Sequence, residues 1–168
     1  SFDALKSLLS HASPPDFHVK IDTGMHRQGF YVEDIPRILN FPKPKSQNLT
    51  ANLKGIYTHF ASAKDINYPT YPEMQFQTFQ KAIRLFERAG FNNLVKHCAA
   101  TGGALVDKKY HMDAVRIGIG LYGLYPSMEL EMQLPQVRLH PILSWRTMVS
   151  EVKMLKPGDF VGYDLAEH

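Results

Sequence analysis

The stretch FHVKIDTG, residues 17–24, is short and rich in β-branched side chains, and it ends in the turn-prone pair Thr23-Gly24. β-Branched residues favour strands, and a glycine-containing pair directly after them favours a turn. We therefore predict a strand over 17–22. This strand should deliver polar residues at its carboxyl end into a functional loop.

The same succession of elements extends on both sides of this strand. The apolar spacing over residues 2–9 is helical and stops before two prolines, so the tail of a helix precedes the strand. A helix-like segment over 32–39 follows and leads to a connector rich in Pro, Lys and Ser at 41–48. A second strand is predicted over 53–58, and His59 lies just beyond it.

The clearest helical signal covers residues 72–89. Thr70 suits the N-cap, and Gly90 suits the position just after the last turn. Four large apolar side chains recur at helical spacing and predict one buried stripe: Phe76, Phe79, Ile83 and Phe86.

Two more strands are predicted over 94–98 and 114–117. Strands that alternate with helices favour right-handed β-α units and a parallel sheet. We therefore expect an α/β fold whose four β-α units form half of a parallel (β/α)8 barrel, with functional residues at the carboxyl ends of its strands.

The pattern changes after Pro126. Residues 143–155 have no helical period, and they lead through a turn at 156–159 to the short run 160–163. That order is typical of an antiparallel β-hairpin. We predict a domain boundary near residue 136, with a partial barrel at 1–136 and the first strands of a C-terminal antiparallel β domain at 137–168.

Composition excludes several classes of protein. The 168 residues are 44% hydrophobic and 21% charged, as in an ordinary globular chain, and no apolar run approaches the roughly 20 residues of a membrane span. The net charge of +3 is spread along the chain, so we expect neither a nucleic-acid nor a membrane partner. The lone Cys98 excludes an internal disulfide and fits a cytoplasmic location. Both ends of the chain lack natural boundaries, so we expect a piece of a longer protein.

Polar residues gather where the predicted strands end. Signatures of nucleotide-binding loops, zinc proteases and serine hydrolases are absent, and no metal site is predicted. Taken singly, each polar residue suits a structural or surface role. Together they suit an anionic, phosphorylated cofactor, because Arg offers a planar fork to an oxygen anion or ring nitrogen, while hydroxyl and amide groups bind phosphate. The residues are Arg27, His59, His97, Thr101, Arg116 and Gly118.

Four successive motifs carry a family resemblance: KIDTGMHRQG at 20–29, GIYTHFASAKD at 55–65, HCAATGGAL at 97–105 and DAVRIGIGLYG at 113–123. They resemble bacterial alanine racemase, and shorter matches after residue 143 continue the resemblance. It implies a fold-type III enzyme that uses pyridoxal 5′-phosphate (PLP), with a β/α barrel, a C-terminal β domain and a homodimer with shared active sites. Such an enzyme interconverts L- and D-alanine by two-base α-proton transfer and supplies D-alanine for peptidoglycan. By this resemblance, the present chain is the second half of the parallel (β/α)8 barrel and the first strands of the β domain.

The resemblance also implies roles for single residues. Arg116 matches the arginine at the pyridine nitrogen, and His59 matches the histidine that supports it. Arg27 matches the arginine directed at the cofactor's phenolic oxygen and the substrate carboxylate. Lys20 matches a lysine that is carbamylated in many members.

Further matches concern the cofactor phosphate and the second catalytic base. Thr101 stands where a phosphate-binding Ser is usual, and Gly118 and Ile119 match backbone phosphate contacts. Tyr163 matches the base that reaches the other subunit's site. Departures from the usual pattern are Ala100 in place of Asn, Thr101 in place of Ser, and Gly162 and Asp164 beside Tyr163.

The motif that bears the cofactor-bonded lysine is expected to precede Ser1. We therefore expect the isolated chain to be inactive. The alternatives are another fold-type III enzyme, such as a racemase for serine or another amino acid, a decarboxylase or an aldolase, or else a non-catalytic half-barrel that only binds a partner.

Overall fold

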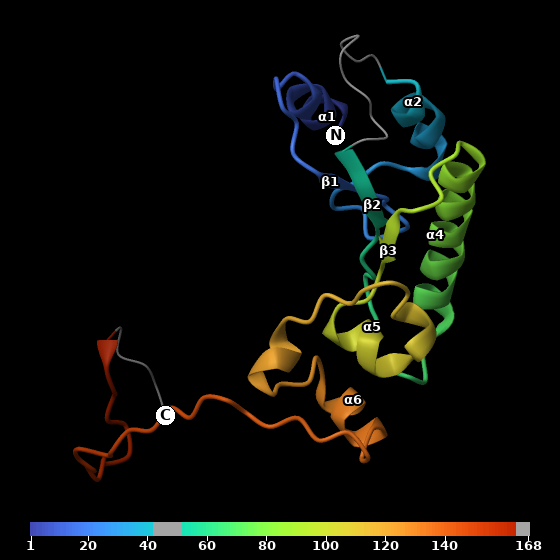
Figure 1. Ribbon diagram of the computed structural model, residues 1–168. Coiled ribbons are helices and arrows are strands. Elements are labelled where there is room, and N and C mark those ends of the chain that lie inside the picture. The colour runs from blue at the N-terminus through green and yellow to red at the C-terminus, as the bar shows by residue number, and fades with distance from the viewer. Residues whose placement is uncertain (42–51, 164–168) are drawn as a thin grey trace.

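The fold is built on a parallel β-sheet. The computed structural model describes residues 1–41 and 52–163. In these ranges the sheet has three strands in the order β1 (Phe17–Lys20), β2 (Leu53–Tyr57) and β3 (Val95–His97), all parallel. The three predicted strands and their parallel arrangement are thus confirmed (Figure 1).

Helices alternate with these strands, as the sequence pattern predicts. Helix α1 (Phe2–Leu9) precedes β1, and the 3-10 helix η1 (Val32–Asp34) runs into α2 (Ile35–Leu39). The long helix α4 (Thr70–Arg88) connects β2 to β3. Apart from Phe41, the connector predicted over 41–48 lies outside the described residues.

Helix α4 has the predicted extent and buried face. Its N-cap is Pro69 rather than Thr70, because the carbonyl of Pro69 already accepts the first helical hydrogen bond, from the Glu73 amide at 2.9 Å. Gly90 follows the helix with φ +90°, a left-handed conformation that favours glycine. The whole apolar stripe is buried: Phe76, Phe79, Ile83 and Phe86.

The hydrophobic core lies between the sheet and its helices. Ile56 from β2, Ile21 directly after β1, and Phe79 and Phe86 from α4 are fully buried in one cluster. Each such side chain contributes roughly 1.5–3 kcal/mol to folding. The core therefore fixes the strands against α4 and with them the loops that follow the strands.

The chain after β3 departs from the predicted fourth strand. Helix α5 (Thr101–Val106) and the 3-10 helix η2 (Lys108–Tyr110) come first. Residues 114–117 then form only an isolated parallel bridge, between Arg116 and Ala100. The Arg116 amide donates to Ala99 O at 3.0 Å, so the segment lies beside the end of β3 but pairs too briefly to make a strand.

The predicted C-terminal hairpin is also not seen. After η3 (Ile119–Tyr122) and α6 (Met128–Gln133), the described chain up to residue 163 contains no strand, and it runs away from the sheet (Figure 1). The predicted turn does form, since the Asp159 amide donates to Lys156 O at 3.0 Å. A strand needs a neighbour for its backbone and its apolar side chains, and here Trp145 is 92% exposed. Residues 164–168 of the predicted β domain lie outside the described residues.

No helix among the described residues has the length and apolar character needed to cross a membrane.

Candidate functional site

Arg116 is the centre of a polar cluster at the carboxyl ends of the strands. Its guanidinium donates to Thr58 O at 2.7 Å and to Cys98 O at 3.2 Å. It also contacts Nδ1 of His59, at 3.1 Å, and Nδ1 of His97. Three predicted strand-end residues from three segments of the chain are therefore brought together.

The contacts of Arg116 assign the protons of the two histidines. A guanidinium has only donors, so Nδ1 of both His59 and His97 must accept. In neutral His97 the proton is then on Nε2, which lies 2.8 Å from Nδ1 of His18 and donates to it. The result is a directed chain of hydrogen bonds from Arg116 through His97 to His18.

Both histidines that face Arg116 favour the neutral form. Burial, with the charge of Arg116 and the neighbouring His18, lowers the pKa of His97 to about 4. Burial and the charges of Arg116, Arg27 and Lys20 lower the pKa of His59 as well. At neutral pH the cluster thus holds a cationic guanidinium between neutral imidazoles.

The ring of Tyr57 restrains the orientation of His97 and Arg116. Its ring stacks on that of His97, with centroids 5.0 Å apart and an interplanar angle of 8°. The guanidinium carbon of Arg116 lies 5.2 Å from the centroid of the same ring. Stacking and a cation–π contact therefore limit how far either side chain can rotate.

A cavity of about 380 Å³ adjoins the cluster and is lined by both Arg116 and Thr101. There the buried hydroxyl of Thr101 accepts from the amides of Gly118, at 3.1 Å, and Gly120, at 3.3 Å. A Cβ on Gly120 would lie 2.7 Å from the Cγ2 methyl of Thr101, so only glycine permits this approach. The lining residues are His59, Ala100, Thr101, Gly102, Arg116, Gly118, Ile119 and Pro126.

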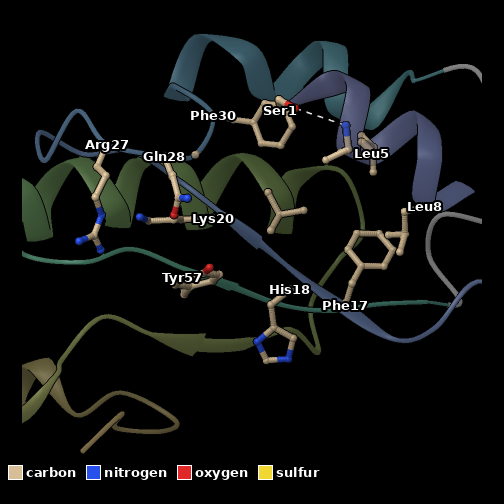
Figure 2. A pocket seen from close by; sticks show the side chains of 13 residues that line it. Ser1, Leu5, Leu8, Phe17, His18, Lys20, Arg27, Gln28, Phe30 and Tyr57 are labelled. Atoms are coloured by element: carbon tan, nitrogen blue, oxygen red, sulfur yellow. Dashed lines mark hydrogen bonds between the residues drawn. The ribbon is translucent and has the colours of Figure 1, made fainter. Parts of the chain in front are cut away.

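Lys20 and Arg27 line a second cavity, of about 620 Å³, beside β1 (Figure 2). Burial, followed by the charge of Arg27, lowers the pKa of Lys20. The loop that carries Arg27 is shaped by Asp22, whose Oδ1 accepts from the amides of Gly24, Met25 and His26 at 3.0–3.1 Å. Although burial alone would raise the pKa of Asp22, these amides lower it, so the carboxylate that orders the loop stays charged.

Tyr163 is not brought to this cluster. It lies near the end of the described chain, in the segment that runs away from the sheet, and it is 99% exposed (Figure 1). Its phenol is therefore open to another part of the protein or to another copy.

Two polar residues of this region, His18 and Gln75, were not identified from the sequence. His18 is two residues before Lys20 on β1. Residues at that spacing share one face of a strand, so the sequence places His18 on the same side of the sheet as Lys20. The other is Gln75 on α4, which is fully buried. Gln75 precedes Phe79 by four residues, so a polar residue at a core position of the helix was the available signal.

Within residues 1–41 and 52–163, no group of His, Cys, Asp and Glu side chains is arranged to hold a metal ion.

Comparisons with known proteins agree on one family. The family model described as "Alanine racemase, N-terminal domain" matches residues 1–126. An alanine racemase of Leptospira interrogans is 36% identical over 166 residues, which cover 96% of this chain and 42% of that protein. Alanine racemase 1 of Bacillus subtilis is 37% identical over 147 residues, covering 88% of this chain and 36% of that protein.

A solved structure gives the same result. The alanine racemase of Bacillus anthracis with bound L-Ala-P superposes with a TM-score of 0.76 at 29% identity, covering 99% of this chain and 42% of that one. This chain thus spans less than half the length of the relatives it matches. The chain belongs to the alanine racemase family.

Proposed function

We propose that the protein containing this chain is a PLP-dependent alanine racemase that interconverts L- and D-alanine. The observation that carries the proposal is the placement of Arg116, which neutral His59 and His97 hold beside a cavity that Thr101 and Gly118 also line. A permanent cation and groups that can bind phosphate therefore line the same cavity.

The residues present fit PLP. Thr101, with the backbone of Gly118 and Ile119, would hold the phosphate. A Cβ at Gly118 would meet nothing within 4 Å, so the space beside Gly118 is open to a ligand. Arg116 would face the pyridine nitrogen and donate to it without giving up a proton, because a guanidinium stays protonated. When bound, PLP supplies an electron-withdrawing ring that acidifies Cα of the amino acid. His59 would keep Arg116 in place through its Nδ1 acceptor.

Lys20 and Arg27 would act on the substrate side. The lowered pKa of Lys20 increases the fraction of free amine that can react with CO2 to form a carbamate. The carbamate's negative charge would hold Arg27, which would in turn bind the substrate carboxylate and the phenolic oxygen of the cofactor. This supports the carbamylation of Lys20 as part of the proposal.

Tyr163 would be the second base, acting in the site of a partner subunit. Its phenol is 99% exposed and so is open to contact with a neighbouring copy, as a homodimer with shared sites requires. In that position it would remove the α-proton of L-alanine, while a base on the opposite face serves D-alanine.

We further propose that residues 1–136 form half of a (β/α)8 barrel and that residues 137–168 begin a C-terminal β domain. The enzyme would work in the cytoplasm and supply D-alanine for peptidoglycan.

The test is substrate selection by the full-length protein. Purified protein with added PLP is given L-alanine or L-serine, and the D-enantiomer is measured by chiral chromatography. We expect D-alanine to form faster than D-serine. Faster turnover of serine would favour the rival racemase, and formation of an amine or an aldehyde in place of a D-amino acid would favour a decarboxylase or an aldolase.

A further inference from the structure

Gln75 joins the loops that follow β1 and β2 through one buried side-chain amide. Its Oε1 accepts from the Ala61 amide at 2.9 Å. Its Nε2 donates to His59 O and to Thr23 Oγ1, each at 3.3 Å. The side chain lies inside the protein between α4 and these loops, with 0% of its surface exposed.

The contacts of Gln75 continue to Arg116. Thr23 Oγ1, which accepts from Gln75, lies 2.8 Å from the hydroxyl of Thr58, and both threonines are buried. The carbonyl of Thr58 then accepts from Arg116 at 2.7 Å. A second route is shorter, since Gln75 holds the backbone of His59, whose ring accepts from the same guanidinium.

The chemistry of these contacts requires an amide. Ala61 offers a donor and His59 a carbonyl acceptor, so only a side chain with both an acceptor and a donor satisfies the two backbone groups. A residue needed only to fill space would be apolar, because a buried polar group that loses its partners costs roughly 1–3 kcal/mol. Gln75 thus fits the loops as well as the core.

We propose that Gln75 is a positioning residue for the pair His59 and Arg116. By holding the backbone that directly follows the His59 side chain, at His59 O and Ala61 N, it sets where Nδ1 meets the guanidinium, and so it fixes the direction in which Arg116 faces the cavity. This inference rests on the proposed function only for its effect on catalysis. Its structural consequence, a displaced His59 ring, can be measured without any activity.

The first experiment replaces Gln75 by Met, which has a similar length but no hydrogen-bonding amide, in the full-length protein. The control is Gln77→Met, the same change at an exposed position on the same helix. The imidazole ¹⁵N shifts of His59 are recorded over pH, with His59 assigned from a His59→Asn spectrum. We expect Gln75→Met to move the Nδ1 shift and to alter the His59 titration, while Gln77→Met matches the parent.

A second variant protects the test against a folding failure. Thr23→Val keeps the shape of the side chain but removes the hydroxyl that Gln75 and Thr58 share. We expect it to move the His59 signal in the same direction by a smaller amount. If Gln75→Met does not fold, Thr23→Val decides alone. Unchanged His59 shifts in every variant that folds would overturn the proposal.

Kinetics separates this inference from the proposed function. With PLP and alanine, Gln75→Met is expected to lower kcat on the order of tenfold to a hundredfold and to change KM little, since it misplaces a group near the reacting atoms rather than removing a substrate contact. A full-length parent that does not racemise alanine, together with a displaced His59 signal, would refute the function and leave the positioning role standing. An active parent with an undisturbed His59 signal in both variants would support the function and refute the positioning role.

Discussion

Nδ1 of His59 accepts a hydrogen bond from the Arg116 guanidinium at 3.1 Å, so the lone pair of this imidazole is committed to Arg116. The proton of neutral His59 is therefore on Nε2. Because His59 also lines the cavity beside Arg116, the arrangement offers the cavity a neutral donor next to a fixed cation.

Arg116→Lys should destabilise the protein although the charge is kept. A lysine ammonium cannot reach two carbonyls and two imidazole nitrogens at once, so some of these acceptors lose their partner. We expect a loss of about 2–4 kcal/mol in the free energy of unfolding, measured by urea denaturation. Arg84→Lys, on the exposed face of α4, is the control and should change it by less than about 0.5 kcal/mol. Equal stability of the two variants would mean that the contacts of Arg116 do not hold the strand ends together.

His97 should make stability depend on pH in a defined window. The unfolded chain binds a proton at His97 near pH 6.5, whereas the folded protein binds it only near pH 4, where its pKa lies. Between these values the unfolded state holds more protons, so stability falls as the pH falls, by up to about 1.4 kcal/mol per pH unit. Denaturation of the parent and of His97→Gln between pH 4 and pH 8 isolates this term by difference. Parallel pH profiles would show that His97 has an ordinary pKa.

Gly120→Ala should disturb the proposed phosphate site mainly through a clash with the Thr101 methyl group, since the other close methyl, Cγ2 of Ile117, would lie 3.2 Å away. The new Cβ would lie 2.7 Å from Cγ2 of Thr101 and would push the Thr101 side chain out of place. We expect weaker PLP binding by the full-length protein, measured by fluorescence titration. Thr101→Ser keeps the hydroxyl and removes that methyl, so the double variant should recover most of the lost affinity. If Thr101→Ser restores nothing, the clash with this methyl is not the cause.

Tyr163→Phe should affect the two enantiomers unequally. The change removes a proton carrier that we assign to one face of the substrate only, so proton abstraction from L-alanine should fall by roughly 10²–10⁴-fold, while D-alanine is affected less. The measurement is exchange of the Cα hydrogen in D2O, followed by NMR for each enantiomer. An equal loss for both would remove Tyr163 from the role of base.

Much of the fold could be predicted because local patterns and tertiary structure agree. The strand at Phe17–Lys20 is confirmed, as its β-branched residues and the glycine-containing turn after it predict. The helix at Thr70–Arg88 is confirmed because its apolar stripe at helical spacing packs into the core. Polar residues after parallel strands meet at one edge, which is why Arg116 and His59 could be placed together from the sequence. The pattern of the chain and the geometry of a parallel sheet were sufficient for these features.

The features that the structure does not confirm depend on neighbours that the local sequence pattern does not contain. The hairpin over 143–163 has strand-like composition, but a strand forms only where another strand pairs with it, and Trp145 and Tyr163 lie exposed instead. The strand at 114–117 is reduced to one bridge for a related reason, since it pairs only at the end of β3. The role of Gln75 depends on loops far from it in sequence. The only sequence signal for this role is that a polar residue stands at a core position of the helix.

The most direct test of the central assignment is the initial rate of D-alanine formation from L-alanine by the full-length protein with PLP, compared among the parent, Arg116→Lys and Arg84→Lys. If Arg116 is the cation that faces the bound cofactor, the parent and Arg84→Lys should form D-alanine at similar rates, and Arg116→Lys should be slower by on the order of a hundredfold or more. A parent that forms no D-alanine, or an Arg116→Lys variant that matches the parent, would contradict the assignment.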